Sequence, residues 1–234
     1  TDNTATTTTT VKVKLDPLAD APNLKVTDVW TKEDSSGVAL KIETSPNSPT
    51  ETLTIKVTGI EPSWTITNLN GGTYDAATKT WSITLAPGAS FNGGPTLKPP
   101  ADSDADLTGI SVNVTATQTN GSTASANATT NVYVDAVADA PNLSASASGG
   151  NEGAQIALNI ATSVKDNDGS EKIDSVVIKG VPSNYSLSAG TKLANGDWLL
   201  TSDQLSGLKI NTVKGGSLDF TLTVVSTSKE QVAA

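Results

Sequence analysis

The sequence predicts an all-β protein that contains two β-sandwiches in tandem. Three observations support this prediction: apolar residues alternate with Thr, Ser and Lys, turn residues recur between these stretches, and the second half of the chain repeats the first. Alternation with a period of two places apolar side chains on one face of a strand, whereas an amphipathic helix has a period of 3.6. Short strands separated by frequent turns are typical of β-sandwiches.

Alternating stretches predict strands along the whole chain, each with one buried face. In order, they are Val11–Leu15, Leu53–Val57, Ile110–Val114, Val132–Val134 and Leu218–Val224. Pairs of Gly, Pro and Asn residues between them favour turns and loops. These pairs are Gly71-Gly72, Gly93-Gly94, Pro99-Pro100, Asn120-Gly121, Asn195-Gly196 and Gly215-Gly216.

An internal repeat organises the chain. The hexapeptide Ala19–Leu24 recurs letter for letter as Ala138–Leu143, 119 positions later, and further matches follow at a similar offset. The later match between Val112–Thr117 and Leu222–Thr227 has an offset of 110. A repeat of this length corresponds to one sandwich domain. The first repeat therefore carries an insertion, which we place in the Pro- and Gly-rich stretch Pro87–Asp106.

The repeat boundaries divide the chain into three parts. Residues 19–136 form the first sandwich, and residues 137–234 form a second, incomplete one. The first repeat ends with the stretch Thr129–Asp135 before an Ala-Asp-Ala-Pro linker, and the second repeat has no counterpart of that stretch. Residues 1–18 also lead into such a linker, so Thr6–Asp16 is expected to be the orphan final strand of a neighbouring repeat.

An incomplete sandwich has an unpaired edge, which favours pairing with another strand. Our hypothesis is that Thr6–Asp16 completes the second sandwich, either within the same chain or between chains joined head to tail. The alternative is that the sequence is a piece cut at an arbitrary point with ragged ends.

Composition excludes several classes of function. The chain has no His, Cys, Met or Arg, so it has no means to build a zinc finger, a haem or iron–sulfur site, a disulfide or a Ser-His-Asp triad. A net charge of −9 argues against a nucleic-acid partner or an anionic membrane surface. With no long apolar run, membrane insertion is not expected. We expect no enzyme activity and no small-molecule substrate; a surface of this charge would attract a cation.

One acidic loop in the second repeat predicts a Ca²⁺ site. Asp166 and Asp168 are two residues apart, Gly169 permits a sharp bend, and Glu171 adds a longer side chain. Calcium takes six to eight oxygen ligands and tolerates irregular geometry, so this loop supplies part of a coordination shell. Asp139 of the linker and Glu152 are the expected additional ligands. The alternative interpretation is a solvated acidic turn.

The first repeat has a weaker version of the same loop. Its matching segment, Thr44–Glu51, keeps the final Glu but has neither Asp. A poorer site there would use four acidic residues: Asp20, Glu33, Asp34 and Glu51. A separate acidic cluster lies in the insertion, where calcium binding and plain solvation are both open interpretations. It consists of Asp102, Asp104 and Asp106.

Several of these motifs together resemble a known family. The Ala-Asp-Ala-Pro linkers, the Asp166–Glu171 loop, and Asp197–Thr201 leading to Leu205–Ile210 are similar to the immunoglobulin-like tandem repeats of bacterial RTX adhesins. The resemblance implies immunoglobulin-like sandwiches, the C-terminal one lacking its last strand as in the split domains of such adhesins. It also implies location at the bacterial cell surface, other domains of the same adhesin as partners, and linker calcium ions. The implied ligands are Asp139, Glu152, Asp166, Asp168 and Glu171.

Three functions are weighed on this basis. The favoured one is an extracellular, calcium-stiffened spacer that projects ligand-binding modules for attachment and biofilm formation. The second is a glycan- or protein-binding module in which Trp30 or Trp64 and the Asp102–Asp106 loop face the ligand. Trp81 and Trp198 occupy equivalent places in both repeats and are therefore expected in the cores. A carboxylate-dependent glycosidase is least favoured, because no pair of acids beside an aromatic cleft is apparent.

Overall fold

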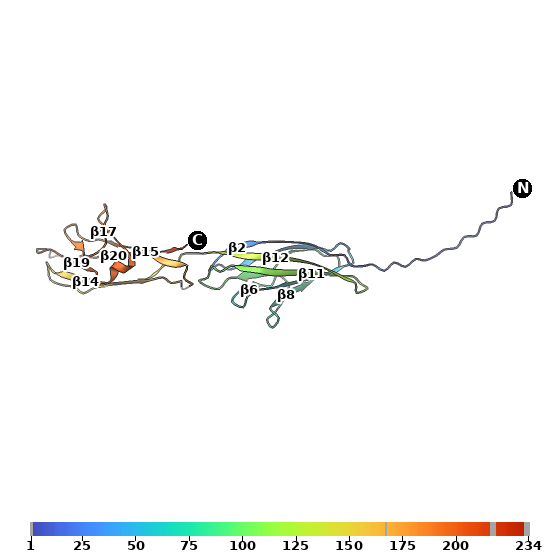
Figure 1. The fold of residues 1–234 in the computed structure, drawn as a ribbon, viewed down its shortest axis with the longest axis horizontal. Helices are drawn as coiled ribbons and strands as arrows, with labels where there is room; N and C mark the ends of the chain where they lie inside the picture. The colour runs from blue at the N-terminus through green and yellow to red at the C-terminus, as the bar shows by residue number, and fades with distance from the viewer. Residues whose placement is uncertain (1, 167, 216–218, 232–234) are drawn as a thin grey trace. The chain divides into compact units, whose positions relative to one another are not determined.

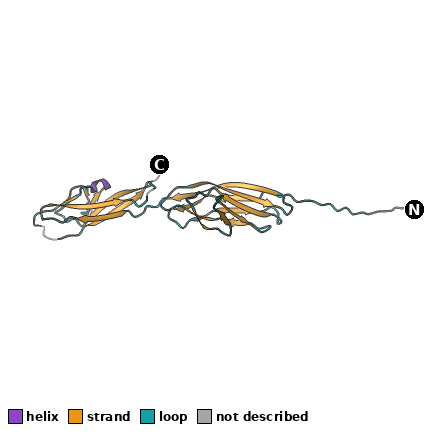
Figure 2. Cartoon of the chain, turned by 90° about the horizontal axis from the view of Figure 1, so that it is seen from below, coloured by secondary structure: helices purple, strands orange, loops and turns teal. Residues whose placement is uncertain are grey.

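The computed structural model describes residues 2–166, 168–215 and 219–231. Its structure is nearly all β, with one short 3₁₀ helix, η1 (Ser202–Leu205), among the described residues (Figures 1 and 2). Two compact units are present. Unit 1 consists of Thr1–Trp30, Ser36–Lys98 and Asp106–Tyr133, and unit 2 consists of Thr31–Ser35, Pro99–Ala105 and Val134–Ala234. Unit 2 thus includes two short segments of the first repeat.

The strands of the first repeat are β1 (Asn23–Thr27), β2 (Val29–Lys32), β3 (Val38–Ala39), β4 (Lys41–Ser45), β5 (Thr52–Thr58), β6 (Thr65–Asn68), β7 (Thr73–Asp75), β8 (Thr80–Thr84), β9 (Phe91–Gly93), β10 (Thr96–Lys98), β11 (Leu107–Thr117) and β12 (Thr123–Asp135). One sheet has the order β2-β12-β11-β5-β8-β7, and the other layer contains β1-β4-β9 and β3-β10-β6. Alternate residues of both layers are buried, among them Ile42, Ile55, Val57, Val112 and Val114.

The strands of the second repeat are β13 (Asn142–Ala147), β14 (Gln155–Ser163), β15 (Glu171–Lys179), β16 (Ser186–Leu187), β17 (Thr191–Lys192), β18 (Trp198–Leu200), β19 (Lys209–Asn211) and β20 (Thr223–Glu230). They form two four-stranded sheets, β13-β14-β19-β16 and β17-β18-β15-β20. Residues of both sheets, including Leu158, Val176, Ile178 and Ile210, share one apolar core. Unit 2 is therefore a second β-sandwich.

One sheet of unit 2 matches four strands of the large sheet of unit 1, whereas β2 and β12 have no counterpart strand among the described residues of unit 2. The sheet β17-β18-β15-β20 corresponds to β7-β8-β5-β11 of unit 1, so β20 occupies the place of β11. In unit 1, β12 pairs with β11 on its other side and also neighbours β2. Among the described residues of unit 2, no strand pairs with that side of β20. The predicted immunoglobulin-like sandwich with a missing last strand agrees with this arrangement.

Three predicted strands are confirmed, because Leu53–Val57, Ile110–Val114 and Val132–Val134 lie within β5, β11 and β12. The prediction for Leu218–Val224 was placed too early. Leu218 lies outside the described residues, Asp219–Leu222 is not strand, and β20 begins at Thr223.

The predicted strand at Val11–Leu15 is wrong for this chain. No strand is assigned or drawn between residues 2 and 22 (Figure 1), and the side chains of Val11, Val13 and Leu15 are 83%, 75% and 86% exposed. Alternation creates an apolar face, but a strand also needs a neighbour to accept its backbone hydrogen bonds. Within the described residues, this segment has none.

The burial of the four tryptophans agrees with the prediction except at Trp64. Trp81 and Trp198 are buried in the two cores, as expected. Trp64 was expected to be exposed, but only 7% of its surface is accessible, so it is a core residue too. Trp30 is 59% exposed. Within the described part of the chain, no helix is long and apolar enough to cross a membrane.

Candidate metal centre

The acidic loop between β14 and β15 is bent by its own carboxylates. The N–H of Asp168 donates to Asp166 Oδ1 at 3.0 Å, and the N–H of Ser170 donates to Asp168 Oδ1 at 2.8 Å. Gly169 has φ +97°, a left-handed conformation that suits glycine. Short Asp side chains that bond to backbone two residues ahead stabilise such turns locally. The loop therefore presents the remaining carboxylate oxygens at the start of β15.

Glu33 reaches the same place from the segment that follows β2. Its N–H donates to the carbonyl of Asp135 at 3.1 Å, and its Oε1 accepts the N–H of Val137. One carboxylate oxygen from each of Glu33, Asp166 and Asp168 lies within 4.8 Å of the other two. We call these three residues the Glu33 group. All three belong to unit 2, although Glu33 comes from the first repeat.

Two buried carboxylate oxygens of this group have no hydrogen-bond partner. Glu33 and Asp166 are each only 3% exposed, and Glu33 Oε2 and Asp166 Oδ2 are buried with no hydrogen-bond partner. Glu171 Oε2, at the start of β15, is buried in the same state. Burial of an unpaired carboxylate oxygen is costly, and a bound cation would offset that cost. The donor set consists entirely of carboxylate oxygens, which suits a hard cation such as Ca²⁺.

Electrostatics around Glu33 and Asp104 point the same way, whereas the hydrogen bond from the Ser170 hydroxyl lowers the pKa of Asp168. Burial raises the pKa of the Glu33 carboxyl to about 7, and the nearby negative charge of Asp166 adds to this, whereas the Val137 hydrogen bond opposes it. Burial also raises the pKa of Asp104, whose N–H lies 3.4 Å from Asp168 Oδ2. Ionised carboxylates in this group therefore disfavour one another, and a cation would relieve the repulsion.

Glu230 adds a further carboxylate to this acidic region, and no local sequence motif indicates it. It is the register partner of Glu171 in the β15–β20 pair, and it is half-buried. Burial is the main cause that raises the pKa of Glu230, and the negative charges of Glu171 and Asp166 add to it. Only the strand pairing places two Glu residues side by side, so no local motif could have identified it.

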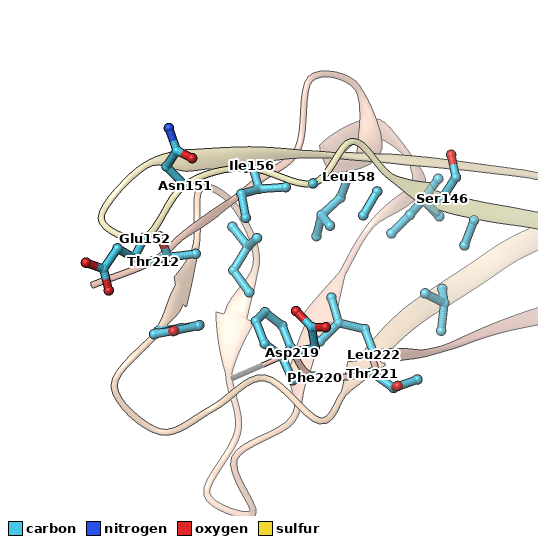
Figure 3. A pocket seen from close by; sticks show the side chains of 18 residues that line it. Ser146, Asn151, Glu152, Ile156, Leu158, Thr212, Asp219, Phe220, Thr221 and Leu222 are labelled. Atoms are coloured by element: carbon cyan, nitrogen blue, oxygen red, sulfur yellow. The ribbon is translucent and has the colours of Figure 1, made fainter. Parts of the chain in front are cut away.

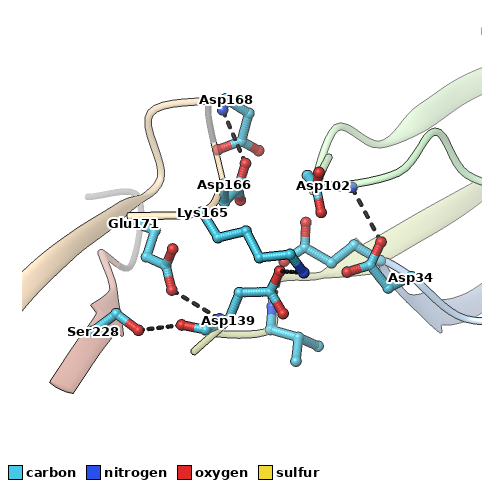
Figure 4. Close-up of polar contacts among 10 residues, drawn as sticks. Asp34, Asp102, Asp139, Lys165, Asp166, Asp168, Glu171 and Ser228 are labelled. Carbon is cyan, nitrogen blue, oxygen red and sulfur yellow. Dashed lines mark hydrogen bonds and ion pairs between the residues drawn. The ribbon is translucent and has the colours of Figure 1, made fainter. Parts of the chain in front are cut away.

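A second acidic group, also in unit 2, already contains a positively charged side chain, that of Lys165. Oxygens of Asp34, Asp102 and Asp139 lie within 4.8 Å of one another, and the Asp102 N–H donates to Asp34 Oδ1 at 3.1 Å (Figure 4). Lys165 Nζ lies 2.7 Å from Asp139 Oδ2, and this hydrogen bond is the main cause that raises the pKa of Lys165. The ammonium group already neutralises part of the negative charge, so this second group has less need of a metal ion.

The linker residue Asp139 contributes mainly through its backbone. Its N–H donates to Glu171 Oε1 at 2.8 Å, and its carbonyl accepts the hydroxyl of Ser228 on β20 (Figure 4). The side chain points to Lys165 instead of the Glu33 group. Asp139 therefore fastens the linker to β15 and β20, while its carboxylate belongs to the second group.

Two other predicted ligands lie elsewhere. Glu152 Oε2 accepts the N–H of Gly215 at 2.8 Å, and Glu152 is in neither acidic group. Asp106 is exposed, belongs to unit 1 and is also in neither group.

In the matching loop of the first repeat, hydrogen-bond donors of the chain satisfy the final Glu. Glu51 is fully buried, and its two carboxylate oxygens accept the N–H groups of Asp20 at 3.0 Å and of Asn47 and Ser48 at 3.1 Å each. In the same loop, Asn47 Nδ2 donates to the carbonyl of Ala21 at 2.7 Å. Both oxygens of Glu51 are thus satisfied by the chain itself, so this loop has no need of a metal ion.

Trp30 provides an exposed aromatic surface in the first repeat. Its ring stacks on that of Tyr133, with centroids 5.2 Å apart and an interplanar angle of 29°. Because Trp64 is buried, Trp30 is the one of the two proposed ligand-facing tryptophans that is accessible.

No protein-family model matches the chain, and no curated protein sequence matches it. Among solved structures, the human desmocollin-1 ectodomain is 14% identical over 94% of this chain and 37% of its own, with a TM-score of 0.33. A Ca²⁺-stabilized adhesin with which an Antarctic bacterium binds ice is 15% identical, over 91% of this chain and 49% of its own, with a TM-score of 0.30. The C-terminal domain of the Streptococcus agalactiae AgI/II polypeptide BspA is 8% identical, over 90% of this chain and 96% of its own, with a TM-score of 0.27. Likenesses at this level do not bear on function.

Proposed function

We propose that this chain is a calcium-stabilised spacer of an extracellular bacterial adhesin, a module that holds ligand-binding domains of the parent protein away from the cell surface during attachment and biofilm formation. The observation that carries the proposal is the burial of unpartnered carboxylate oxygens on Glu33 and Asp166 within a group that also contains Asp168. The resemblance to RTX adhesin repeats supports the wider biological role.

The Glu33 group would hold the calcium ion. Glu33, Asp166 and Asp168 would supply carboxylate oxygens, with Glu171, Glu230 and Asp104 adding negative charge around them. Calcium takes six to eight oxygens, so water and backbone would complete the shell. Extracellular modules often bind calcium at roughly 0.1 to 1 mM, so the site would be filled outside the cell.

Calcium binding would stiffen the linker, because the proposed ligands and their neighbours are hydrogen-bonded to the linker backbone. Glu33 is hydrogen-bonded to Asp135 and Val137, and Glu171 is hydrogen-bonded to Asp139, so the linker backbone is already fastened to residues of this region. An ion held by Glu33 and the Asp166–Asp168 loop would tie the two together. Loss of the ion would leave like charges in place of that tie, and the linker would then bend more easily.

Thermal unfolding of the full chain in EDTA, in millimolar calcium and in millimolar magnesium tests the proposal. Binding to the folded state alone adds about 2.7 kcal/mol at a hundred times the dissociation constant, which raises the melting temperature by several degrees. We expect this rise with calcium and a smaller one with magnesium, which demands stricter octahedral geometry.

Two variants separate specific binding from general charge effects. Asp168→Ala removes a member of the Glu33 group and is expected to lose most of the calcium response. Asp75→Ala removes the same charge from an exposed turn that bonds to Ala77 and Thr78, and is expected to keep it. Equal melting temperatures in EDTA and calcium, or an equal calcium response in both variants, would contradict the proposal.

A second candidate function rests on the exposed Trp30–Tyr133 stack. Flat aromatic surfaces bind sugars and protein side chains, so the first repeat would then act as a glycan- or protein-binding module. Glycan-array binding by the wild-type chain that disappears in Trp30→Ala, while the circular dichroism spectrum is unchanged, would favour this function over the spacer.

A further inference from the structure

Unit 2 contains an open apolar groove between its two sheets. The groove has a volume of about 680 Å³ and is lined by residues of β13, of β14 and of the chain that leads into β20 (Figure 3). Its apolar lining includes the partly buried side chains of Ile156, Ile160, Leu222 and Val224. An uncovered entrance to the hydrophobic core of a domain is an expected site for a partner.

The first sandwich shows what covers the equivalent place. There β12 lies between β2 and β11, and the side chains of its residues Thr130, Val132 and Val134 are buried. In unit 2, β20 corresponds to β11 but lies at the edge of its sheet. The counterpart of β2 is residues 148–151, which have no strand assignment. Among the described residues of unit 2, no strand therefore takes the place beside β20 that β12 has beside β11.

We propose that this groove binds residues 4–16 of a second copy of the chain as an antiparallel strand beside β20. This segment and β12 both precede an Ala-Asp-Ala-Pro linker, and that linker aligns them at an offset of 119. Val11, Val13 and Leu15 then stand at the positions of Thr130, Val132 and Val134. Their high exposure in the single chain becomes burial in the complex, which favours association.

The same alignment predicts the register. In unit 1, Ser111 pairs with Thr129 and Val112 with Ala128. Because β20 follows β11 at an offset of 110, Thr221 should pair with Thr10 of the second copy, and Leu222 with its Thr9.

Charge complementarity supports this occupant. The charged residues that line the groove, Glu152 and Asp219, are both acidic, whereas the charged residues of segment 4–16 are Lys12, Lys14 and Asp16, a net positive charge. In unit 1, the N–H of Gly109 donates to Asn131 Oδ1 at 2.9 Å, so these two positions are in contact. Their counterparts are Asp219 and Lys12. An opposite-charge pair would thus form at a place where the template already has a polar contact.

Association of this kind is head to tail, because each copy donates its N-terminal segment and accepts another in unit 2. Heterologous contacts that do not close produce chains of molecules instead of a fixed dimer. The proposal does not depend on the metal centre, since the groove residues and the Glu33 group have no member in common.

Sedimentation velocity of the full chain over a wide range of concentrations tests the association. Val13→Asp places a charge on the face that should be buried, and Thr10→Asp places the same charge at the position of the exposed Thr129. Both residues are exposed in the single chain, so neither substitution should unfold it. We expect concentration-dependent association in the wild type and in Thr10→Asp, and its loss in Val13→Asp.

Disulfide trapping tests the register, because the chain has no cysteine of its own. Paired antiparallel residues have Cα atoms about 4.5 to 5.5 Å apart, within the range that a disulfide bridges. Thr10→Cys combined with Thr221→Cys should form disulfide-linked multimers under oxidation, and Thr10→Cys combined with Thr227→Cys should not. A monomer at every concentration, equal association in both aspartate variants, or a cross-link within one chain would overturn the proposal.

Discussion

Glu33 and Glu152 each stand ten residues after the Asn that opens β1 or β13, yet only Glu33 joins the acidic loop of Asp166 and Asp168. Glu152 instead accepts the N–H of Gly215. The carboxylate at this repeat position therefore belongs with the acidic loop of the following repeat, not with that of its own. This relationship distinguishes the Glu33 group from a local acidic turn, because Glu33 comes from a distant part of the chain.

Substitution of these two glutamates should have opposite consequences. Glu33→Gln removes a buried carboxylate whose pKa is raised to about 7, so at neutral pH the variant should be at least as stable as the wild type in EDTA. In calcium it should be less stable, because a ligand is lost. Glu152→Gln should leave the calcium response unchanged. Melting temperatures of the three proteins in EDTA and in calcium measure both effects, and a wild-type calcium response in Glu33→Gln would remove Glu33 from the site.

One substitution in each of the two matching loops, Asp166→Asn and Asn47→Asp, tests why only the second loop is expected to bind calcium. Asp166→Asn keeps an oxygen that can accept the Asp168 N–H, so the loop should fold, but the calcium response should fall sharply. Asn47→Asp should gain no calcium response, because Thr44–Glu51 offers no second Asp to act with it. It should lose about 1 kcal/mol of stability, since an aspartate cannot donate to the Ala21 carbonyl as Asn47 does. Calorimetry with and without calcium checks both variants.

A calcium-dependent gain in Asn47→Asp would contradict the explanation of the first loop. It would mean that the backbone N–H groups around Glu51 give way to an ion. The result would then extend the metal centre to both repeats.

Local sequence patterns predicted those features that depend on neighbouring residues. Alternation identified β5 and β11 because both lie inside a sheet, with partners on each side. The Asp166–Glu171 loop was identifiable because two Asp residues, a Gly and a Glu bend the chain and bind each other locally. Equivalent tryptophans in both repeats predicted burial for the same reason: the same position in the same fold has the same neighbours.

Features that depend on distant partners were not predictable in the same way. Glu230 enters the acidic region only through its register with Glu171, and Glu33 only through its contact with the linker. The Val11–Leu15 segment has the alternation of a strand but no neighbour among the described residues. Trp64 has no tryptophan counterpart in the second repeat, so repeat comparison did not reveal its burial.

The difference between core and surface tryptophans is measurable. Trp81→Ala should cost about 3 to 5 kcal/mol, because it empties a fully buried site and leaves the Leu69 carbonyl without its 2.8 Å hydrogen bond. Trp30→Ala should cost about 0.5 to 1.5 kcal/mol, the value of an aromatic contact such as its stack on Tyr133. Urea unfolding followed by circular dichroism gives both values, and similar costs for the two variants would contradict the observed difference in burial.

Asp28 should make the first sandwich sensitive to acid. Its Oδ1 accepts the N–H of Asn131 at 2.8 Å and the hydroxyl of Thr130 at 3.2 Å, which joins β12 to the segment between β1 and β2. The Asn131 N–H is the main cause that lowers the pKa of Asp28 below 3.8, and burial opposes it. Between the folded pKa and 3.8 the unfolded state binds more protons, so this stabilisation is complete above 3.8 and is lost as the pH falls through the folded pKa.

Asp28→Asn isolates that contribution, because the amide keeps an acceptor oxygen but has no charge to titrate. We expect a lower melting temperature than the wild type at pH 7, and a difference that shrinks as the pH falls through 3.8. Both proteins should be measured in EDTA, so that any calcium bound to the Glu33 group does not contribute. The remaining carboxylates titrate in both proteins, and their effect cancels in the comparison. A difference that stays constant with pH would show that Asp28 acts through the geometry of its hydrogen bonds and not through its charge.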